Sequence, residues 1–495
     1  MLPHHLEFPK KHEIVILFLA LILLNLLGAI LYNVFFHPLA KIPGPLACKI
    51  TRIWLYLAER GGDGANTVSV LHKRYGPLVR VAPNEISIKD REAFVTINKQ
   101  GTQFLKDPTF YDAFKSDHGM LFSFSGVDEH SKRKRLMSPS FSRASEEEHD
   151  AILHETIKPV VEELTTSIRK GETIALFPVI RRFALKSIVA FCYGQNPVSP
   201  DYMESVIPKL FKVLDESPKA LLTLQHFPLI KKTLNHLSAT FPTLFPSDIR
   251  ILPTVGMELL QSSRKSSVQS GLFKQMQSLL KAKDQSLTDG ELIAESGTMF
   301  FAGTDTTAIT VSFALWYLMH QPDNYVRLQD ELKTVMPDVN SKASLRELES
   351  LPFLEACIKE SLRLACPPRG RLPRIVPAEG WEVKGTKLPA GTVVSSCISY
   401  IAHDEEIFPE PKKYRPERWL QENSKELEGY FYPFSRGTRS CIGQSLSLAE
   451  QRVAIAQVVR RFSPSKDMQF RDIIGSEYVT FVMQDELPVQ LEEAR

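Results

Sequence analysis

One cysteine near the end of the chain stands in a setting that suits a thiolate ligand. Residues 434–443 run Phe-Ser-Arg-Gly-Thr-Arg-Ser-Cys-Ile-Gly, which places Cys441 between Gly437 and Gly443, and a helical pattern follows directly. Glycines let a backbone turn tightly and approach a flat ligand, and N–H groups of the loop and of the next helix can stabilise a thiolate. A buried thiol at a loop–helix junction explains the same spacing. The loop alone leaves both interpretations open.

A second candidate for chemistry lies in the middle of a long helix. Residues 288–320 begin with a Thr-Asp-Gly-Glu capping box and end before Pro322, which predicts one helix roughly 50 Å long. Its centre, Ala-Gly-Thr-Asp-Thr-Thr at 302–307, contains weak helix formers, and threonine hydroxyls there can bond to the carbonyl four residues earlier. An amphipathic helix with a polar side is the simpler explanation. An acid in an apolar helix is costly unless it is used, so we expect a site at Asp305 and Thr306.

The elements that position these residues begin with an N-terminal membrane anchor. Residues 14–36 carry no charge, and as a helix they would extend roughly 35 Å, enough to cross the hydrocarbon core of a bilayer. A cleaved signal peptide would have a shorter apolar core and a small-residue cleavage site, whereas a proline-rich stretch follows here. We expect an uncleaved anchor over residues 1–37, a proline-rich hinge over 38–50 and one large domain over 51–495.

Composition and charge place the large domain in the cytosol and exclude several classes of function. The net charge is only +3, which is too small to predict nucleic-acid binding. The six cysteines show no paired spacing, which predicts neither a zinc site nor a disulfide framework and is typical of a reducing compartment. The cations that closely follow the apolar span outnumber Lys10 and Lys11 before it, which favours a cytosolic domain.

The large domain is predicted to be mainly helical with short strands. Alternating apolar residues at 78–81 and 85–88 indicate two strands around a Pro-Asn turn. A basic helix follows at 130–137, where four consecutive cations indicate a solvated face or a docking surface. Residues 205–255 are helical and apolar, and they could form core or a flap that rests on a membrane. The aromatic residues of that region include Phe227, Phe241 and Phe245. A later helix at 354–364 carries a Glu and an Arg three residues apart, where they can pair.

Taken together, these stretches resemble a cytochrome P450 over nearly the whole chain. Four motifs of that family occur in its order: Ala302-Gly303-Thr304-Asp305-Thr306-Thr307, Glu360-x-x-Arg363, Pro416-Glu417-Arg418-Trp419 and Phe434-x-x-Gly437-x-Arg439-x-Cys441-x-Gly443. The last motif is highly specific, while Glu-x-x-Arg gains meaning only from its position before it. The sequence at 35–41, Phe-Phe-His-Pro-Leu-Ala-Lys, resembles the hinge of membrane-bound fungal members, which often work in secondary metabolism.

The resemblance implies the cytochrome P450 fold, mainly α-helical with small β-sheets, here with one N-terminal transmembrane helix. It implies that residues 51–495 form a single haem-thiolate catalytic domain that holds haem b, with Cys441 as the axial ligand of the iron. Such a thiolate pushes electron density towards the iron and favours cleavage of the O–O bond. The same loop would contribute Phe434, Gly437 and Gly443 to the cofactor site.

The resemblance also implies cationic contacts to the haem propionates. These contacts would come from Arg439, Arg374, His403, His130 and Lys134. The family usually carries Trp and Arg where this chain has His130 and Lys134, and a lysine cannot reproduce the bidentate fork of an arginine. Glu360, Arg363 and Arg418 would form a structural triad behind the haem, with a role in folding. The family's Phe after that Arg is Trp419 here.

For the reaction, the resemblance implies a monooxygenase that uses NADPH and O₂ to oxidise a lipophilic small molecule such as a terpenoid or polyketide. Asp305 and Thr306 would manage proton delivery to dioxygen, while Ala302 and Gly303 would leave room for oxygen and substrate. Apolar pocket walls are expected from Phe110 to Phe124, Phe300-Phe301, Ile375-Val376 and Phe481.

The expected partners follow from the same resemblance. The sequence carries no convincing dinucleotide-binding motif, so electrons would come from the membrane-bound NADPH–cytochrome P450 reductase, with cytochrome b5 as a second candidate. Its acidic face would dock on Lys132 to Arg135 with Arg436. We expect a single-pass protein of the endoplasmic reticulum membrane that faces the cytosol and binds no nucleic acid. The alternatives are an isomerase or dehydratase of the same family, a membrane-anchored haem sensor, and a helical interaction protein without haem.

Overall fold

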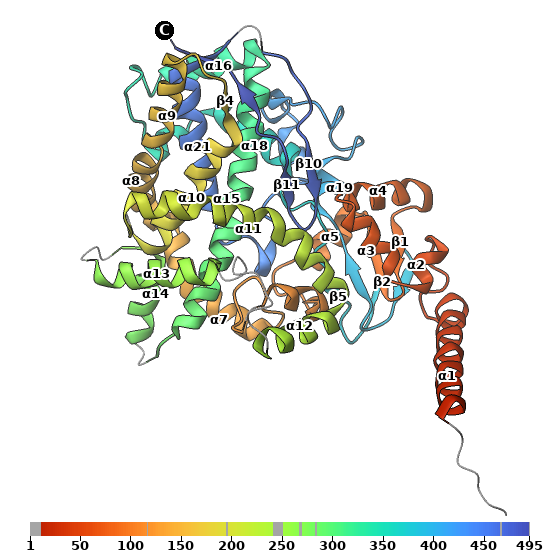
Figure 1. The fold of residues 1–495 in the computed structure, drawn as a ribbon. Coiled ribbons are helices and arrows are strands. Elements are labelled where there is room, and N and C mark those ends of the chain that lie inside the picture. The colour runs from red at the N-terminus through yellow and green to blue at the C-terminus, as the bar shows by residue number, and fades with distance from the viewer. Residues whose placement is uncertain are drawn as a thin grey trace, which may run out of the picture.

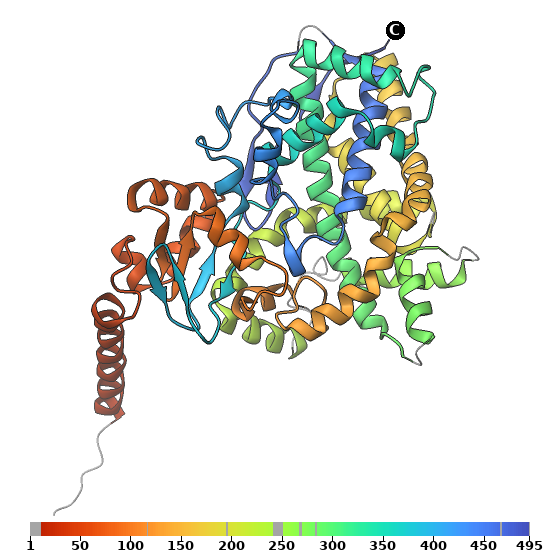
Figure 2. The same ribbon diagram turned by 180° about the vertical axis from the view of Figure 1, so that it is seen from behind.

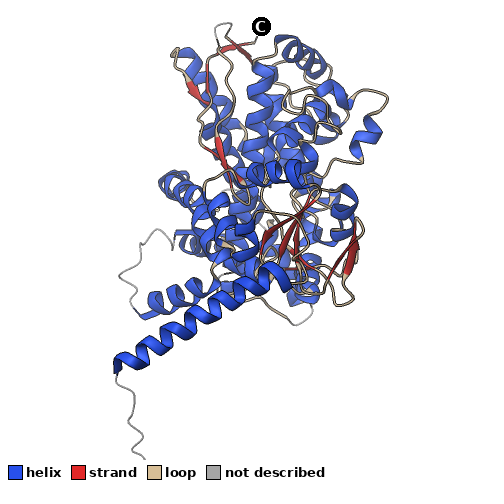
Figure 3. Ribbon diagram, turned by 90° about the vertical axis from the view of Figure 1, so that its right-hand side faces the viewer, coloured by secondary structure: helices blue, strands red, loops and turns tan. Residues whose placement is uncertain are grey.

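The computed structural model describes residues 11–115, 117–194, 197–240, 251–266, 270–282, 285–465 and 468–494. Within them, a body of packed helices adjoins a smaller part that contains the main β-sheet and the first helices after the anchor (Figures 1 and 2). One helix projects away from both parts (Figure 3). The predicted fold class, mainly helical with small sheets, is confirmed.

The projecting helix is the predicted apolar segment. It consists of α1 (Lys11–Leu31) and a π-helical turn, η1 (Tyr32–Phe36), and none of its residues is buried. By length and composition, its 26 residues are sufficient to cross a membrane. The stretch after it is packed onto the sheet through the buried side chains of Leu39 and Ile42. Residues 1–10, which include Lys10, lie outside the described part of the chain.

The helices that follow are short in the sheet-containing part and long in the body. In chain order they are α2 (Leu46–Ile50), α3 (Ile53–Arg60), α4 (Gly64–Tyr75), α5 (Arg91–Ile97), α6 (Pro108–Tyr111), α7 (Val127–Met137), α8 (Glu146–Thr156), α9 (Lys158–Arg169), α10 (Leu176–Tyr193), α11 (Pro200–His226), α12 (Pro228–Thr240), α13 (Ile251–Lys265), α14 (Leu272–Lys281), α15 (Asp289–Met319), α16 (Pro322–Lys333), α17 (Leu345–Glu349), α18 (Pro352–Ala365), α19 (Ile398–Ala402), α20 (Ser424–Glu428) and α21 (Gln444–Arg461). Short 3-10 turns include η7 (Pro416–Trp419) and η8 (Gly437–Arg439).

Helix α15 is the central element of the body. Its N-terminus has the predicted capping box, in which Thr288 and Glu291 satisfy each other's backbone N–H groups. The helix packs against α10, α13, α18 and α21. Its C-terminal half belongs to one large apolar core and its N-terminal half to another. An apolar helix that is buried on all sides over its second half is held by packing rather than by propensity.

The main sheet is small and mixed. Its order is β1-β2-β8-β5-β3, with β2 and β8 parallel and the other neighbours antiparallel. The strands are β1 (Leu78–Ala82), β2 (Glu85–Ile88), β3 (Leu105–Lys106), β4 (Ile174–Ala175), β5 (Arg374–Ile375), β6 (Trp381–Val383), β7 (Thr386–Leu388), β8 (Val393–Ser395), β9 (Phe462–Pro464), β10 (Gly475–Glu477), β11 (Phe481–Met483), β12 (Pro488–Val489) and β13 (Leu491–Glu493). The pairs β10-β11, β12-β4, β13-β9 and β6-β7 form separate two-stranded sheets. The two strands predicted around the Pro-Asn turn are confirmed as β1 and β2.

The apolar region predicted at 205–255 divides into three helices. Its described residues belong to α11, α12 and α13, and Phe227 ends α11. Phe241 and Phe245 lie outside the described residues. Helix α12 exposes the apolar side chains of Leu229, Ile230, Leu234 and Leu237.

Candidate functional site

The cysteine loop closes through its own backbone and one required glycine. It contains η8 and leads into α21, and the Cys441 N–H donates to the Phe434 carbonyl at 2.9 Å. Gly437 has a φ of +68°, and a Cβ there would stand 2.1 Å from the Asn98 carbonyl oxygen, so both backbone and space exclude a side chain. Gly443 has an ordinary φ of −83°, and an added Cβ would meet nothing closer than 3.9 Å. The tight turn therefore depends on Gly437 rather than on Gly443.

Cys441 differs from the other cysteines in its exposure. Of the six cysteines, all of them described, Cys441 alone is exposed. Burial nevertheless raises the pKa of this thiol, while the Gly443 N–H and the Lys134 ammonium group lower it. The two polar neighbours favour the thiolate form, which is the form that binds metals.

Five basic side chains gather beside this loop and form a cationic cluster. They are Lys106, His130, Lys134, Arg374 and Arg439, each buried or half-buried. Burial lowers the pKa of each of them, and repulsion from the other cations lowers the pKa of His130 further, to about 3, and that of Arg439 to about 10. Among the described residues, no Asp or Glu makes an ion pair or hydrogen bond with any of the five. His130 is therefore neutral near pH 7, and the positive charge of this partly buried cluster lies on the lysines and arginines.

Within the described part of the chain, the hydrogen bonds of this cationic cluster go to neutral acceptors. Lys134 donates to the Thr438 carbonyl at 2.8 Å, and Arg439 donates to three carbonyls of the 124–126 backbone at 2.7 to 3.1 Å. Arg374 makes two long bonds of 3.3 Å, and its buried Nε has no partner. Buried cations without anions are costly, so this cluster suits a ligand that brings negative charge.

Thiol and cluster together fit a haem group. Haem carries an iron that accepts a thiolate and two carboxylates that the cations can pair with. Helix α15 leaves interior space as well, because Ala302 is exposed and Thr306 half-buried in the middle of this central helix. The hydroxyls of Thr307 and Ser447 lie 3.0 Å apart and join this part of α15 to α21, the helix after the cysteine loop. The residues present therefore match the donor set that haem requires.

His403 does not belong to the cationic cluster, contrary to the expectation. Its Nε2 lies 3.2 Å from the Leu364 carbonyl in the last turn of α18. Burial and the charges of Arg369 and Arg363 lower the pKa of the ring to about 3. The ring therefore satisfies a helix end on the triad side of α18 and does not meet the other predicted propionate contacts.

Lys106 joins the cluster although sequence reasoning misses it. Strands β3 and β5 pair with Lys106 directly opposite Arg374. The Lys106 side chain is 6% exposed, and its Nζ donates to the Phe122 carbonyl at 2.5 Å. Both strands are only two residues long, so no periodic pattern in the sequence predicts their pairing. Only the register of the sheet shows that Lys106 belongs to the cluster.

The threonines of the predicted α15 site bond back along the helix as expected. Thr306 Oγ1 donates to the Ala302 carbonyl at 2.7 Å, and Thr310 Oγ1 donates to the Thr306 carbonyl at 2.9 Å. A Cβ on Gly303 would lie 2.9 Å from the Ile188 side chain. The glycine therefore lets α10 pack closely on α15. Ala302 is exposed in the same turn.

Asp305 is tightly paired. Its two oxygens accept hydrogen bonds from Arg181 of α10 at 2.6 and 2.9 Å, and Arg181 also donates to Asp215 of α11 at 2.7 Å. Burial raises the pKa of Asp305, and Arg181 lowers it. The Asp215 side chain is 47% exposed, so the three side chains link the interior of α15 to solvent. Sequence reasoning misses Arg181, because it lies 124 positions before Asp305 in an apolar helix.

The structure brings the three triad residues together around a fully buried carboxylate. Glu360 accepts from Arg363 at 2.8 and 3.0 Å and from Arg418 at 3.1 Å. It also accepts from the indole N–H of Trp419 at 2.9 Å and from the Arg415 backbone at 3.0 Å. The tryptophan that stands in place of the family's phenylalanine therefore adds a donor to this network.

The four consecutive cations of α7 divide into two kinds. Arg133 is buried and pairs with Glu295 at 2.5 Å and Glu291 at 3.0 Å on α15, and its neighbour Lys134 binds the cysteine loop. Lys132 and Arg135 are exposed. A solvated face is therefore correct for two of the cations only, and the predicted docking surface loses its central arginine.

The predicted pocket walls divide in a similar way. Phe300, Phe110 and Phe481 are at most 3% exposed, and Phe110 lines the small cavity described next. Phe301 and Ile375 are half-buried. In the aromatic loop, Phe114 and Phe122 are half-buried and contact each other edge to face.

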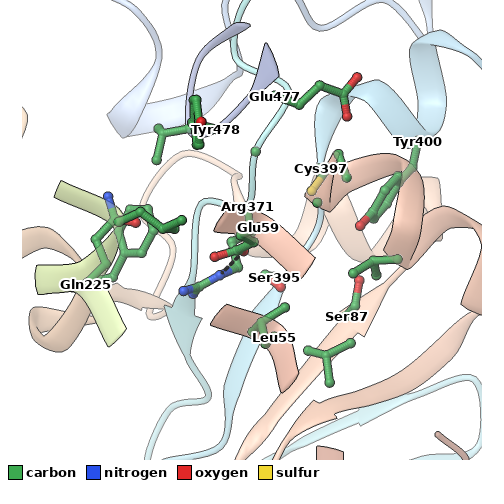
Figure 4. Close-up of a pocket in the computed structure, with 18 residues that line it drawn as sticks. Leu55, Glu59, Ser87, Gln225, Arg371, Ser395, Cys397, Tyr400, Glu477 and Tyr478 are labelled. Atoms are coloured by element: carbon green, nitrogen blue, oxygen red, sulfur yellow. Dashed lines mark hydrogen bonds and ion pairs between the residues drawn. The ribbon is translucent and has the colours of Figure 1, made fainter. Parts of the chain in front are cut away.

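A separate small cavity has a charge-balanced wall. It lies between α3, α4, α11 and the turn after β10, and Figure 4 shows Arg371 beside Glu59 in it. Arg371 pairs with Glu59 at 2.6 Å and with Glu85 at 3.0 Å, and His226 binds Glu59 at 2.6 Å. Burial would raise the pKa of Glu59, but Arg371 and His226 hold it at about 2. Arg52 also pairs with Glu85 at 2.9 Å, so two arginines face two carboxylates in this network, which joins α3, the main sheet and α11.

The comparisons with known proteins agree with this site. The family model described as Cytochrome P450 matches residues 43–491. Among curated proteins, the chain is 31% identical to the cytochrome P450 monooxygenase hkm5 of Aspergillus hancockii over 470 residues, which covers 92% of this chain and 90% of that protein. It is 31% identical to the cytochrome P450 monooxygenase BOT1 of Botryotinia fuckeliana, covering 84% of each chain. It is 29% identical to the cytochrome P450 monooxygenase TRI4 of Trichoderma arundinaceum, covering 89% of this chain and 86% of that protein. The chain therefore belongs to the cytochrome P450 family of monooxygenase enzymes.

Proposed function

We propose that this cytochrome P450 holds haem b through Cys441 as the axial iron ligand and oxidises a lipophilic small molecule. The observation that carries the proposal is an accessible but desolvated thiol beside five buried or half-buried basic side chains that pair with no carboxylate in the described part of the chain. When bound, the haem supplies reductive activation of O₂ with electrons from NADPH, so that one oxygen atom enters the substrate and the other leaves as water. Arg374, Arg439, His130, Lys134 and Lys106 would hold its two carboxylates.

Replacing the thiol tests the ligand assignment. The reduced carbon monoxide complex of Cys441→Ser should lose the red-shifted Soret band that a thiolate ligand produces. Cys48→Ser, a buried cysteine in α2, should retain the band and serves as the control. A red-shifted band in Cys441→Ser would contradict the assignment.

Thr306 and Asp305 are the proposed proton-handling groups. Thr306 Oγ1 lies on the open side of α15 and can hold and pass a proton, while the Asp305–Arg181–Asp215 path connects that helix to solvent. Thr306→Ala should uncouple NADPH consumption from product formation, with peroxide as the by-product. Thr310→Ala, one turn later on the same helix and fully enclosed, should stay coupled. Full coupling in Thr306→Ala would rule out this role.

The proposed electron donor is the membrane-bound NADPH–cytochrome P450 reductase. Lys132 and Arg135 are exposed on α7, and Arg436 is half-buried in the cysteine loop, so they can meet an acidic face. The double variant Lys132→Gln/Arg135→Gln should slow reduction at low salt, whereas Lys219→Gln on α11 should not. A reduction rate that does not depend on salt would count against this surface.

The proposed location is the endoplasmic reticulum membrane, with a single span and a cytosolic domain. Support comes from the exposed apolar helix α1 and from further exposed apolar side chains on α2, α3 and α12. Of these, Leu229 is 74% exposed, which suits contact with lipid. Resistance to alkaline extraction and loss of a domain tag to protease added outside microsomes would test span and orientation together.

The proposed substrate class is a lipophilic metabolite of fungal secondary metabolism, for example a terpenoid or polyketide. The fungal sources of the relatives and the apolar residues Phe301, Phe122 and Ile375 support it. Metabolite profiling of a strain that lacks the gene would identify the accumulating precursor. Turnover only with reductase and NADPH would separate this function from an isomerase, a dehydratase or a haem sensor.

A further inference from the structure

The loop at residues 120–126 is held by charged side chains through its backbone. Lys106 donates to the Phe122 carbonyl, and Arg439 donates to the carbonyls of Phe124, Ser125 and Gly126. Both cations belong to the cationic cluster proposed to meet the haem carboxylates. The loop backbone therefore fixes where these two cations lie.

One side chain outside the cluster holds the same loop from the other side. Glu295 of α15 accepts a hydrogen bond from the Leu121 N–H at 2.9 Å. The same oxygen, Oε1, accepts from Arg133 of α7 at 2.5 Å. Glu295 thus joins α15, α7 and the loop at one carboxylate oxygen, immediately before the carbonyls that bind Lys106 and Arg439.

Glu295 is costly for the fold. Its side chain is fully buried, and its second oxygen, Oε2, has no hydrogen-bond partner among the described residues. Burial raises the pKa of Glu295 to about 7, although Arg133 and the Leu121 N–H lower it. Arg133 also pairs with the half-buried Glu291 one turn earlier on α15, so the arginine does not require Glu295. The contact that Glu295 alone provides is the one to the loop backbone.

We propose that Glu295 is a positioning residue for the haem carboxylates, because it anchors the 120–126 loop whose carbonyls hold Lys106 and Arg439. This inference rests on the proposed haem site. Loss of the charge at Glu295 weakens one charge-assisted bond to the loop. The loop then moves more freely, and the two cations lose their fixed geometry towards a dianionic ligand.

Haem loss from the holoenzyme tests the proposal. Glu295→Gln keeps the side-chain size but removes the charge, and it should release haem to an excess of a haem-scavenging apoglobin roughly tenfold faster. Glu291→Gln is the matched control, because it removes the other carboxylate partner of Arg133, keeps the capping box and touches no loop N–H. The control should release haem at the wild-type rate. Equal rates in both variants would overturn the proposal.

Amide hydrogen exchange separates positioning from general destabilisation. In wild-type holoenzyme the Leu121 amide should be protected. In Glu295→Gln only the peptide over 120–126 should exchange faster, with an unchanged thermal unfolding midpoint. A uniform increase in exchange rate over the whole chain would show a merely structural role and overturn the proposal. An unprotected Leu121 amide in the wild type would also overturn it. The wild-type measurement decides even where the variant fails to fold. A wild-type protein that takes up no haem would instead refute the proposed function.

Discussion

Two arginines three residues apart, Arg371 and Arg374, have opposite electrostatic surroundings. Both are 5% exposed. Arg371 pairs with two carboxylates, Glu59 and Glu85, which raise its pKa. Arg374 has neutral acceptors at 3.3 Å, an unpaired Nε, and a pKa that burial lowers. Carboxylates of the chain balance the charge of Arg371, whereas no carboxylate among the described residues balances the charge of Arg374.

The difference shows which buried charge serves the fold and which serves a ligand. A buried cation with its anions present contributes mainly to holding elements together, since removing one partner leaves an unpaired charge. A buried cluster of cations without anions raises the free energy of the haem-free protein and is stabilised when an anionic ligand binds. The contrast supports the assignment of the cationic cluster, and not the Arg371 network, to haem.

The largest expected effect is the loss of the balanced arginine. Arg371→Met leaves Glu59 and Glu85 buried without their main partner, so we expect a loss of roughly 3 to 5 kcal/mol in the free energy of unfolding. Chemical denaturation of the haem-free and haem-loaded proteins should show a similar loss. Arg60→Met, an exposed arginine on α3, is the control. An Arg371→Met protein as stable as the wild type would contradict the assignment of Arg371 to the stability of the fold.

Arg374→Met should behave in the opposite way. It removes a cation from a repulsive cluster, so the haem-free protein should be at least as stable as the wild type. Its haem should dissociate roughly tenfold faster or more, because one charged contact to a carboxylate is lost. Denaturation of the haem-free chain and haem transfer measure the two effects separately. A loss of stability without a change in haem affinity would mean that Arg374, like Arg371, serves the fold and not the ligand.

A smaller effect concerns the pH dependence of haem binding. In the haem-free protein, burial and the nearby cations lower the pKa of His130 to about 3. Below the ordinary pKa of histidine, the unfolded chain therefore binds a proton at His130 that the folded chain does not bind. This lowers the stability of the haem-free protein below about pH 6.5. Two carboxylates would raise the pKa of His130, so haem binding should take up a proton in acid.

The comparison with His130→Gln isolates this proton. As the pH falls from about 7.5 to about 5.5, the haem affinity of the wild type relative to the variant should rise, by at most about tenfold per pH unit. Haem titrations at several pH values measure the ratio. A ratio that stays constant would mean that His130 does not face the carboxylates.

Much of this architecture can be predicted from the sequence, because strong local patterns specify it. The capping box predicts the start of α15, the uncharged N-terminal run predicts α1, and the Pro-Asn turn predicts β1 and β2. The threonine at 306 bonds back to residue 302 as its type and spacing predict. These features depend on residues that are close together in the chain.

The charged partners could not be predicted, because they depend on distant segments. Arg181 reaches Asp305 only through the packing of α10 on α15, and Lys106 reaches Arg374 only through two-residue strands. The sequence does not predict the neighbour of His403 for the same reason, since its Nε2 lies 3.2 Å from the Leu364 carbonyl of α18. A motif specifies which residue types are present, while tertiary packing decides which charge each one meets.

The smallest expected effect concerns Glu360, which accepts hydrogen bonds from several donors and can lose one of them at little cost. Glu360 accepts hydrogen bonds from Arg363, Arg418, the Arg415 backbone and Trp419. Trp419→Phe restores the family's usual residue and removes one neutral donor, so we expect a loss of only about 1 kcal/mol. Arg363→Met should cost several times more, since it leaves the buried Glu360 without its bidentate partner. Denaturation of both variants measures the ratio; equal losses would mean that the indole N–H, and not ionic balance, holds this carboxylate in place.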